Sequence, residues 1–422
     1  MSRFESYVYH WQYGHHDRSD LARVYLEGLI HQERGKANIE RMVEARGSSD
    51  EYQRYQRFIT DAPWSAQAVQ RDVRADVSKL TEANRRQGGR STGFLLDESG
   101  HRKSGTQSVG CTRQYLGHLG KVEMGQVGVY ASLINDGVGS LVDQRLYLPK
   151  VWTGDKARCQ KAGIPPQDRR YRSKPELALE MVDDALAAGI PFDWVGGDGL
   201  YGHNYELAKG LDERQVAFLL EVHCDQRVYL EVPELYIPEA KSGRGRKPTR
   251  LKCNQKPLRL DAYVEQLKDE DWTRLKVRKT TKGWLEAEYH ARSCWVWDGR
   301  EQAPRARTML IRRDRNAQGE VIRTKYALAN TSLEQTPIEE LAYRQSQRYW
   351  IERRFQDAKQ ELGLSDFQVR KWSAWHHHHA ICLLALYLME AQKFDHQDQA
   401  PLMSVRDARI MVAAQIAASI IP

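Results

Sequence analysis

Apolar residues recur at helical spacing through the first 88 residues of the chain. In SDLARVYLEGLIHQ (residues 19–32) and SAQAVQRDVRADVSKL (65–80), Leu, Val and Ile return every three or four positions, and a serine precedes each run as a plausible N-cap. This pattern predicts a helical N-terminal domain over residues 1–88.

The pattern changes after Gly88 and Gly89, where short apolar runs replace the helical spacing. GFLLD (93–97), KVEMGQVGVYASLIN (121–135) and GSLVDQRLYLP (139–149) are typical of strands. A helix, SKPELALEMVDDALAAGI (173–190), then precedes the strand DWVGGD (193–198), the helix HNYELAKGLDER (203–214) and the strand VAFLLEV (216–222). Strands followed by alternating β and α segments predict an α/β domain with a mixed sheet, whose first part is residues 89–223.

Residues 224–319 contain basic turns and alternating segments such as WLEAEYHARSCWVW (284–297), and we interpret them as a β-rich insertion. The α/β pattern resumes at KYALAN (325–330). Residues 320–375 are therefore predicted to complete the α/β domain, and residues 376–422 to form a C-terminal helical region.

The stretch RYWIERRFQDAKQELG (348–363) predicts an amphipathic helix. At about 100° per residue, one sector collects the apolar residues that we assign to the core, which are Ile351, Phe355, Ala358 and Leu362. Three charged residues lie within about 40° of one another beside that sector, and these are Arg348, Glu352 and Lys359. Arg353, Asp357 and Glu361 lie well away from these three. The alternative is an ordinary solvated helix, in which the pair of Arg348 and Glu352 adds only about 0.3 kcal/mol.

Composition indicates a soluble globular protein, with 41% hydrophobic and 28% charged residues. No apolar run reaches the roughly 18 residues that a membrane span needs, and the N-terminal sequence MSRFESYVYHWQYG lacks the apolar segment of a signal peptide. The six cysteines are scattered without a CxxC pair, which favours a reducing cytoplasm and no zinc site.

Positive charge is in excess, with 64 Lys and Arg against 56 Asp and Glu, for a formal net charge of +8. This balance suits a polyanionic partner. The tract KSGRGRKPTRLK (241–252) concentrates the cations, including Arg244, Arg246 and Lys247, in a Gly- and Pro-broken segment of the kind that follows phosphates. A solvated linker is the alternative.

Two acids end predicted strands, Asp97 in FLLDESG and Asp198 in WVGGDGLYG. Carboxylates at the ends of adjacent strands can converge, and with Glu352 from a packed helix they could hold two Mg²⁺ ions about 4 Å apart. The alternative is that each acid is an ordinary residue of a strand-end turn. GGDG lacks the spacings of known nucleotide loops, so it carries no separate prediction.

These stretches together make the chain similar to DDE transposases of the IS4-like group, and most closely to the IS701 family. The resemblance runs from about Gly93 to Trp375 and rests on LLDESGHRKSGTQSVGCTRQYLGHLGKVEMGQVGVY, RLYLPKVW, SKPELALEMVDDAL, WVGGDGLYG, YALAN and RYWIERRFQDAKQELGL. It implies a ribonuclease-H-like core in which Asp97, Asp198 and Glu352 are catalytic and bind the metal. The β-rich insertion then lies between the second Asp and the Glu, as the pattern alone already placed it.

The IS4-like signature around the glutamate reads Y, two residues, R, three residues, E, six residues, K. Arg348, Glu352 and Lys359 match it in identity and spacing, which implies that the two cations bind DNA phosphates. Gln345 occupies the tyrosine position, so the phosphate contact implied for that tyrosine is missing. The resemblance also implies that an aromatic residue of the insertion, Trp284, Trp295 or Trp297, stacks on an unpaired base, although alternating tryptophans in a strand more often form core.

The resemblance implies Mg²⁺-dependent cleavage of double-stranded DNA at terminal inverted repeats and strand transfer into target DNA, with Mn²⁺ able to replace Mg²⁺. The N-terminal helices would recognise the repeats, and a homodimer would bridge two ends in a synaptic complex. We expect the protein in the bacterial cytoplasm with the nucleoid and without a membrane partner.

Two other functions fit the same residues. One is a metal-dependent nuclease on the same core that makes no strand transfer. The other is a domesticated DNA-binding protein whose acids are vestigial.

The run HHHH (376–379) precedes the apolar stretch AICLLALYLM. Because adjacent histidines on a helix point in different directions, we predict a polar, DNA-facing helix start there rather than a metal site.

Overall fold

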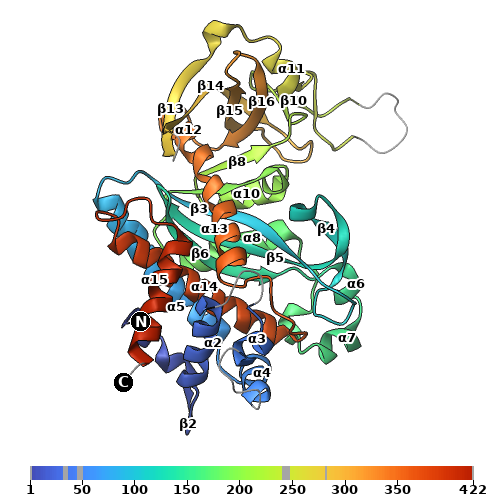
Figure 1. Cartoon of the computed structure of the whole chain (residues 1–422). Coiled ribbons are helices and arrows are strands. Elements are labelled where there is room, and N and C mark those ends of the chain that lie inside the picture. Colours follow the sequence, from blue (N-terminus) through green and yellow to red (C-terminus); the bar gives the residue numbers. More distant parts are fainter. Residues whose placement is uncertain (1, 32–36, 45–50, 240–247, 281–282, 421–422) are drawn as a thin grey trace. The chain divides into compact units, whose positions relative to one another are not determined.

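The computed structural model describes residues 2–31, 37–44, 51–239, 248–280 and 283–420 (Figure 1). The chain divides into two compact units. Unit 1 consists of Met1–Phe192 and Tyr349–Pro422, and unit 2 is the continuous segment Asp193–Arg348 between them. Each unit is described separately below.

The sheet of unit 1 is antiparallel and is built around a long central strand, β5 (Lys121–Asn135). β3 (Thr92–Arg102) pairs along one side of β5, and β4 (Thr112–Leu116) and β6 (Val138–Leu146) pair along the other. Asp136 and Gly137 join β5 to β6 with φ angles of 47° and 86°. Left-handed conformations at both positions are those of a type I′ hairpin turn, whose twist matches that of the flanking strands.

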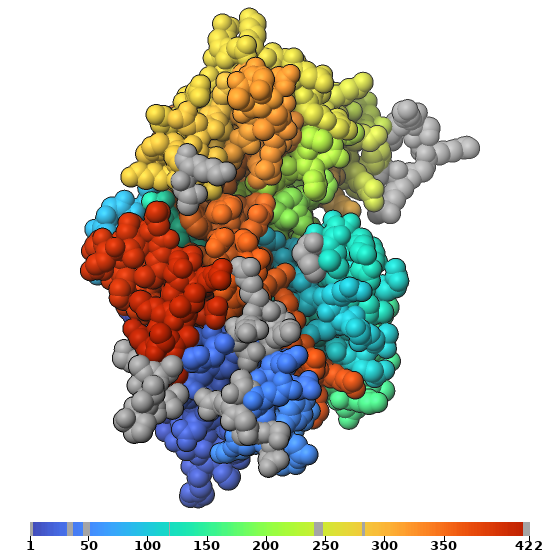
Figure 2. Space-filling view, viewed as in Figure 1, coloured from blue at the N-terminus to red at the C-terminus, as the bar shows by residue number. Residues whose placement is uncertain are grey.

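Helices pack on this sheet from both ends of the chain. The chain begins with a short α1 (Ser2–Glu5), a 3-10 turn (Val8–Trp11) and a small hairpin of β1 (Gln12–Tyr13) and β2 (His16–Asp17). The predicted N-terminal helices follow as α2 (Ser19–His31), α3 (Ile39–Glu44), α4 (Tyr52–Thr60) and α5 (Ala66–Arg86). From the C-terminal part come α13 (Tyr349–Glu361), α14 (Trp372–Asp395) and α15 (Val405–Ile420). α5 and α14 pack together and against β6, and α15 packs on α14 and α2. α15, in red, forms part of the molecular surface in Figure 2.

Unit 1 also contains the connection that follows β6. It consists of α6 (Lys150–Thr153), α7 (Lys156–Lys161), a 3-10 turn (Pro166–Asp168) and α8 (Lys174–Ala187), with another 3-10 turn (Gly117–Leu119) between β4 and β5. α8 begins with a capping box, in which the Ser173 hydroxyl accepts from the Glu176 N–H and the Glu176 carboxylate accepts from the Ser173 N–H. This is the reciprocal arrangement that fixes a helix start, at the residue where the sequence predicted one.

Unit 2 contains the parallel strand pair. β7 (Trp194–Gly197) runs parallel to β8 (Phe218–Val222), with α9 (Gly199–Gly202) and α10 (Tyr205–Glu213) between them in sequence. Antiparallel strands continue the sheet from β8 through β16 (Val321–Ala329), β15 (Arg305–Arg315) and β14 (Gly283–Val296) to β13 (Thr273–Thr280). The predicted α/β class with a mixed sheet is confirmed, as expected of a ribonuclease-H-like core.

The rest of unit 2 is a set of short elements, followed by one longer helix. They are β9 (Arg227–Val228), β10 (Leu235–Tyr236), β11 (Lys252–Cys253), β12 (Leu258–Arg259), α11 (Leu260–Val264), a 3-10 turn (Asp269–Asp271) and α12 (Ile338–Gln347). β9 pairs with β12, and β10 pairs with β11. Among the described residues of the segment predicted to be β-rich, strands are the main regular structure.

Several predicted boundaries differ from those of the structure. The units divide at 192/193 and 348/349, whereas the sequence suggested divisions at 88, 223, 319 and 375. The predicted boundary at 375/376 falls inside α14. The helix predicted over 348–363 begins at Tyr349, because Arg348 follows the end of α12.

The prediction for the histidine run is wrong. His377, His378 and His379 are buried, with exposed fractions of 4% or less, in the first half of α14. His377 contacts the carbonyl oxygens of Ile59 and Trp64 at 2.7 and 2.9 Å, and Tyr25 contacts His378 Nδ1 at 2.8 Å. These contacts with α4, with the segment after it and with α2 place the run inside unit 1 instead of facing DNA. Within the described ranges, no helix combines the length and apolar character needed to cross a membrane.

Candidate active site

Asp97 lies in the middle of β3, whereas the sequence predicted that it ends a strand. Its side chain is 9% exposed, and its Oδ1 accepts a hydrogen bond from the backbone N–H of Glu98 at 2.8 Å. Because side chains alternate across a strand, Glu98 points to the opposite face of the sheet, where it pairs with Lys174 of α8 at 2.9 Å. Of these two neighbouring acids, Asp97 is therefore the one on the face that α13 covers.

α13 carries Glu352 and Lys359 to the same sheet. The helix packs against β3, β5 and β6, and the ring of its Phe355 lies 5.2 Å from that of Tyr130 in β5. The four residues assigned to the core from the helical wheel are all buried, with exposed fractions of 8% or less: Ile351, Phe355, Ala358 and Leu362. Glu352 is exposed and Lys359 is partly buried, so both lie beside the apolar stripe as predicted.

Lys359 lies close enough to Asp97 for the two charges to interact. Burial lowers the pKa of Lys359 to about 8, and the negative charge of Asp97 opposes that shift. The ammonium group also lies 3.4 Å from the carbonyl oxygen of Gly100, further along β3. Glu352 and Lys359, which six residues separate in the family signature, are thus both presented beside the strand of Asp97.

A buried arginine, which the sequence analysis did not identify, fixes α13 in place. Arg354 is 1% exposed, and it donates to the carbonyl oxygens of Gly137 and Gly139, at 2.6 and 2.8 Å, in the turn between β5 and β6. It also pairs with Glu390 of α14 at 2.7 Å and with Asp357 at 3.5 Å. The available signal was weak, because Arg354 on its own looks like any cation of an amphipathic helix.

Asp198 belongs to unit 2 and stands directly after β7. Its side chain caps the short helix α9 by accepting from the N–H of Leu200 at 3.0 Å. α9 lies very close to β8, since a Cβ added at Gly202 would come within 1.9 Å of the carbonyl oxygen of Glu221. The glycines of WVGGDGLYG therefore serve close packing of a turn on a strand.

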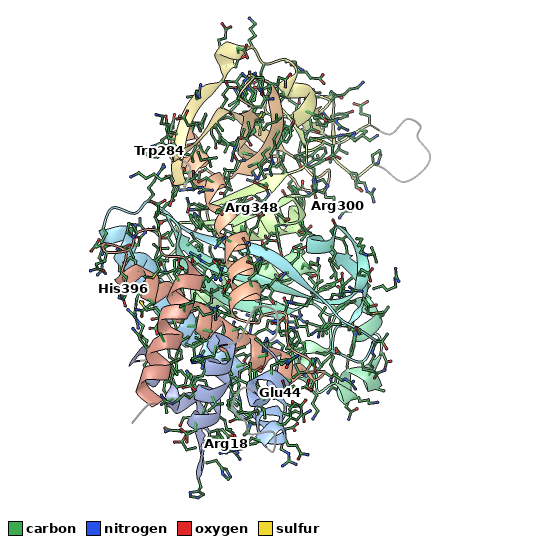
Figure 3. The ribbon with its side chains drawn as sticks, viewed as in Figure 1. Arg18, Glu44, Trp284, Arg300, Arg348 and His396 are labelled. Carbon is green, nitrogen blue, oxygen red and sulfur yellow. The ribbon has the colours of Figure 1, made fainter. Side chains whose placement is uncertain are left out.

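Arg348, which is labelled in Figure 3, is also in unit 2. It pairs with Glu221 of β8 at 3.1 Å. Lys325 of β16 pairs with the same carboxylate at 2.9 Å. In the parallel pair, Gly197 is aligned with Leu220, so Asp198 and Glu221 are the next residues in register. Through its pair with Glu221, Arg348 thus lies at the strand end that carries Asp198. Glu221 is a further residue at this strand end, and the sequence motif did not include it.

The predicted triad is divided between the units, with Asp97 and Glu352 in unit 1 and Asp198 in unit 2. In the part of the chain that the structure describes, no three His, Cys, Asp or Glu side chains are close enough together to hold a metal ion. The basic residues Arg244, Arg246 and Lys247 lie outside the described residues. Among the tryptophans of the insertion, Trp284 is 50% exposed on β14, and Trp295 and Trp297 are partly buried.

Comparison with known proteins identifies the class to which this fold belongs. The sequence model of the DDE superfamily endonucleases matches residues 9–284, more than half of the chain. The chain is a member of the DDE superfamily endonucleases. The match includes Asp97 and Asp198 and ends before Glu352.

One curated relative is a particular transposase. The chain is 26% identical over 186 residues to the probable transposase for insertion sequence element IS701 from Microchaete diplosiphon. The aligned part covers 43% of this chain and 43% of the relative. The chain therefore matches less than half of that protein's length.

Proposed function

We propose that the protein is a transposase that cuts DNA at the ends of an insertion element and joins the freed ends to target DNA. Membership of the DDE superfamily endonucleases and similarity to a probable IS701 transposase support this function. The observation that carries it is the packing of α13 on β3, which presents Glu352 and Lys359 beside the strand of Asp97.

The donor chemistry of the three acids fits a hard divalent cation, because Mg²⁺ prefers carboxylate oxygens and Mn²⁺ accepts the same ligands. Asp97, Asp198 and Glu352 would hold the metal, which supplies charge stabilisation for displacement at phosphorus. Asp97 is pre-positioned by its strand and by the Glu98 N–H, whereas the exposed Glu352 is accessible to solvent.

The chain's cations would orient the DNA. Lys359 lies on the face of α13 that carries Glu352, where an ammonium group can bind a phosphate beside the reacting bond. Arg348 pairs with Glu221 in the described structure, so its contact with DNA requires that this ion pair open or that the guanidinium donate to the carboxylate and the phosphate together. Arg244, Arg246 and Lys247 would bind the DNA backbone. The N-terminal helices would bind the terminal repeats, and a homodimer would hold two ends together.

The decisive experiment replaces Glu352 with Gln, which keeps the shape and removes the charge. The variant is expected to melt at the wild-type temperature and to bind element ends, because Glu352 is exposed and makes no part of the core. Nicking and joining of an end-containing duplex in Mg²⁺ or Mn²⁺ should both fall by at least about 100-fold, since one metal site serves both steps. Wild-type nicking by Glu352→Gln would remove this residue from the active site.

Glu206→Gln is a matched control, because Glu206 is also an exposed glutamate in the first turn of a helix, α10. It should leave nicking unchanged. A donor with a pre-cut 3′-hydroxyl separates the transposase from a simple nuclease, which would produce no joined product. DNA binding without any metal-dependent nicking would instead identify a domesticated binding protein.

A further inference from the structure

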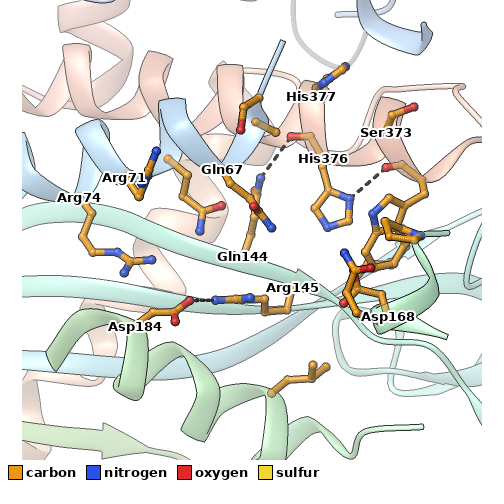
Figure 4. A pocket seen from close by; sticks show the side chains of 18 of the residues that line it. Gln67, Arg71, Arg74, Gln144, Arg145, Asp168, Asp184, Ser373, His376 and His377 are labelled. Carbon is orange, nitrogen blue, oxygen red and sulfur yellow. Dashed lines mark hydrogen bonds and ion pairs between the residues drawn. The ribbon is translucent and has the colours of Figure 1, made fainter. Parts of the chain in front are cut away.

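A cavity of about 710 Å³ opens in unit 1 at β6, and we call it the β6 pocket. Its walls come from the start of α5, the end of β6, α8 and the first turns of α14 (Figure 4). Polar side chains dominate the lining, among them four amides, Gln67, Gln70, Gln144 and Gln167. A volume of this size is typical of small-molecule sites and exceeds what one nucleotide requires.

The charges around the β6 pocket largely cancel. Three arginines of the wall have acid partners, and the ion pairs are Arg74–Asp143, Arg145–Asp184 and Arg172–Asp168. A ligand that binds through charge alone would have to compete with these carboxylates. The pocket is therefore better suited to a neutral polar group than to a phosphate. Arg71 is an exposed cation of the lining, available for a phosphate attached to such a group.

Gln144 and His376 each carry a hydrogen-bond acceptor in the wall of the pocket. Gln144 is 2% exposed and extends from β6 toward α14, where its Nε2 lies 3.4 Å from the carbonyl oxygen of His376. Its Oε1 is buried and has no hydrogen-bond partner among the described residues. A buried amide oxygen without a donor costs about 1–3 kcal/mol, which a ligand N–H would recover.

His376 supplies the second acceptor. Its Nδ1 lies 2.9 Å from the carbonyl oxygen of Trp372, so this nitrogen donates and Nε2 is left with its lone pair. Burial lowers the pKa of His376 to about 4, so the ring is neutral at physiological pH. The indole of Trp372 lies 4.2 Å from the same imidazole, and both rings line the pocket. Aromatic walls of this kind bind planar rings by stacking.

We propose that the β6 pocket binds a nucleobase that carries an exocyclic amino group, with the amino protons donated to Gln144 and His376. Adenine, cytosine and guanine offer two such protons on one nitrogen, whereas thymine offers a single ring N–H. The base has two possible sources, an unpaired nucleotide of a DNA strand and a free nucleotide. The Trp372 ring would stack on either.

This site is separate from the candidate active site. Asp97, Tyr130 and Gln144 are aligned in register across β3, β5 and β6. Two strand spacings, about 10 Å, therefore separate the backbones of Asp97 and Gln144. The inference does not depend on the metal chemistry proposed above, and its test is carried out in EDTA so that the two can fail independently.

The test measures fluorescence anisotropy of the full chain with labelled duplexes that differ only in one unpaired base. The wild type is expected to bind the adenine bulge at least about fivefold more tightly than the thymine bulge, the effect of one additional hydrogen bond. Gln144→Leu should bring this ratio close to one. Gln126→Leu is the matched control, since Gln126 is a buried glutamine of the adjacent strand β5 that does not line the pocket.

Competition by free dAMP, with dTMP as reference, distinguishes the two sources of the base. Displacement by dAMP alone supports a free nucleotide, and an adenine preference without displacement supports a base presented by its strand.

If Gln144→Leu does not fold, His376→Phe provides the same comparison, because it removes the second acceptor and keeps an aromatic ring. Equal binding of both bulges together with no displacement by dAMP would overturn the proposal. An undiminished adenine preference in Gln144→Leu would do so as well.

Discussion

Replacing Arg354 with Met tests whether a buried ion network holds the helix of Glu352 on its sheet. The substitution keeps an apolar stem and removes a guanidinium that contacts Glu390 at 2.7 Å and the carbonyl oxygens of Gly137 and Gly139 at 2.6 and 2.8 Å. Glu390 is 3% exposed, so the change leaves a buried carboxylate whose one remaining ion-pair partner among the described residues is Lys393, at 3.0 Å.

Breaking one side of a buried ion pair typically costs about 3–5 kcal/mol. We expect the lower part of that range for Arg354→Met, because Lys393 still pairs with Glu390. Removing both charges, in Arg354→Met with Glu390→Met, should restore at least about 2 kcal/mol of this loss, since two apolar side chains pack without an unpaired charge. The double variant thus separates the electrostatic cost from the loss of packing.

The assay is urea unfolding followed by tryptophan fluorescence and circular dichroism, fitted with two transitions if the two units unfold separately. Arg353→Met is the control, because Arg353 is 34% exposed and its pair with Asp357, at 2.9 Å, has a second cation nearby. This control should lose no more than about 1 kcal/mol. If Arg354→Met lost no more free energy of unfolding than this control, the network would not hold α13 and the reasoning would be refuted.

Two further predictions concern pH and salt. Burial lowers the pKa of His376 to about 4 and of His378 to about 3, so the unfolded chain takes up protons between roughly pH 6.5 and 4 that the folded chain does not. The free energy of unfolding should therefore fall as the pH drops below about 6.5, by up to about 1.4 kcal/mol per pH unit for each histidine. Denaturant unfolding at pH 7, 6 and 5 measures this change. A free energy of unfolding that stays constant over this range would contradict the prediction. Neutralising Arg244, Arg246 and Lys247 together should weaken DNA binding equally for all sequences and flatten its salt dependence. A loss confined to the cognate end, measured by gel shift at several salt concentrations, would instead make the tract a base reader.

Local periodicity was sufficient to predict elements and buried faces. The apolar stripe of α13, from Ile351 to Leu362, follows from residue spacing alone, and so does the start of α8 at its serine cap. The partners of Arg354 could not be predicted in this way. They come from a turn more than 200 residues earlier and from a different helix, and nothing in the local sequence connects them.

The candidate site shows the same limit. The motif selected Asp97, Asp198, Glu352 and Lys359, and the structure brings the strand of Asp97 and the helix of Glu352 together in unit 1. The motif did not show that Arg348 pairs with Glu221, because that contact depends on how the end of α12 lies beside β8. The histidine run was misjudged for a related reason, since the residues that contact His377 and His378, which are Ile59, Trp64 and Tyr25, are more than 300 residues earlier in the chain.

The discontinuity of unit 1 has a consequence for the order in which the chain folds during synthesis. Unit 2 is a single stretch of 156 residues (348 minus 192), so it can fold as soon as it leaves the ribosome. The strands of unit 1 emerge first but lack α13 and α14, which arrive only after that stretch. At roughly 5–20 residues per second the wait is about 8 to 30 s. During that time the strand of Asp97 lacks the helix of Glu352, so under the proposed function a nascent chain would cleave no DNA until α13 has been added.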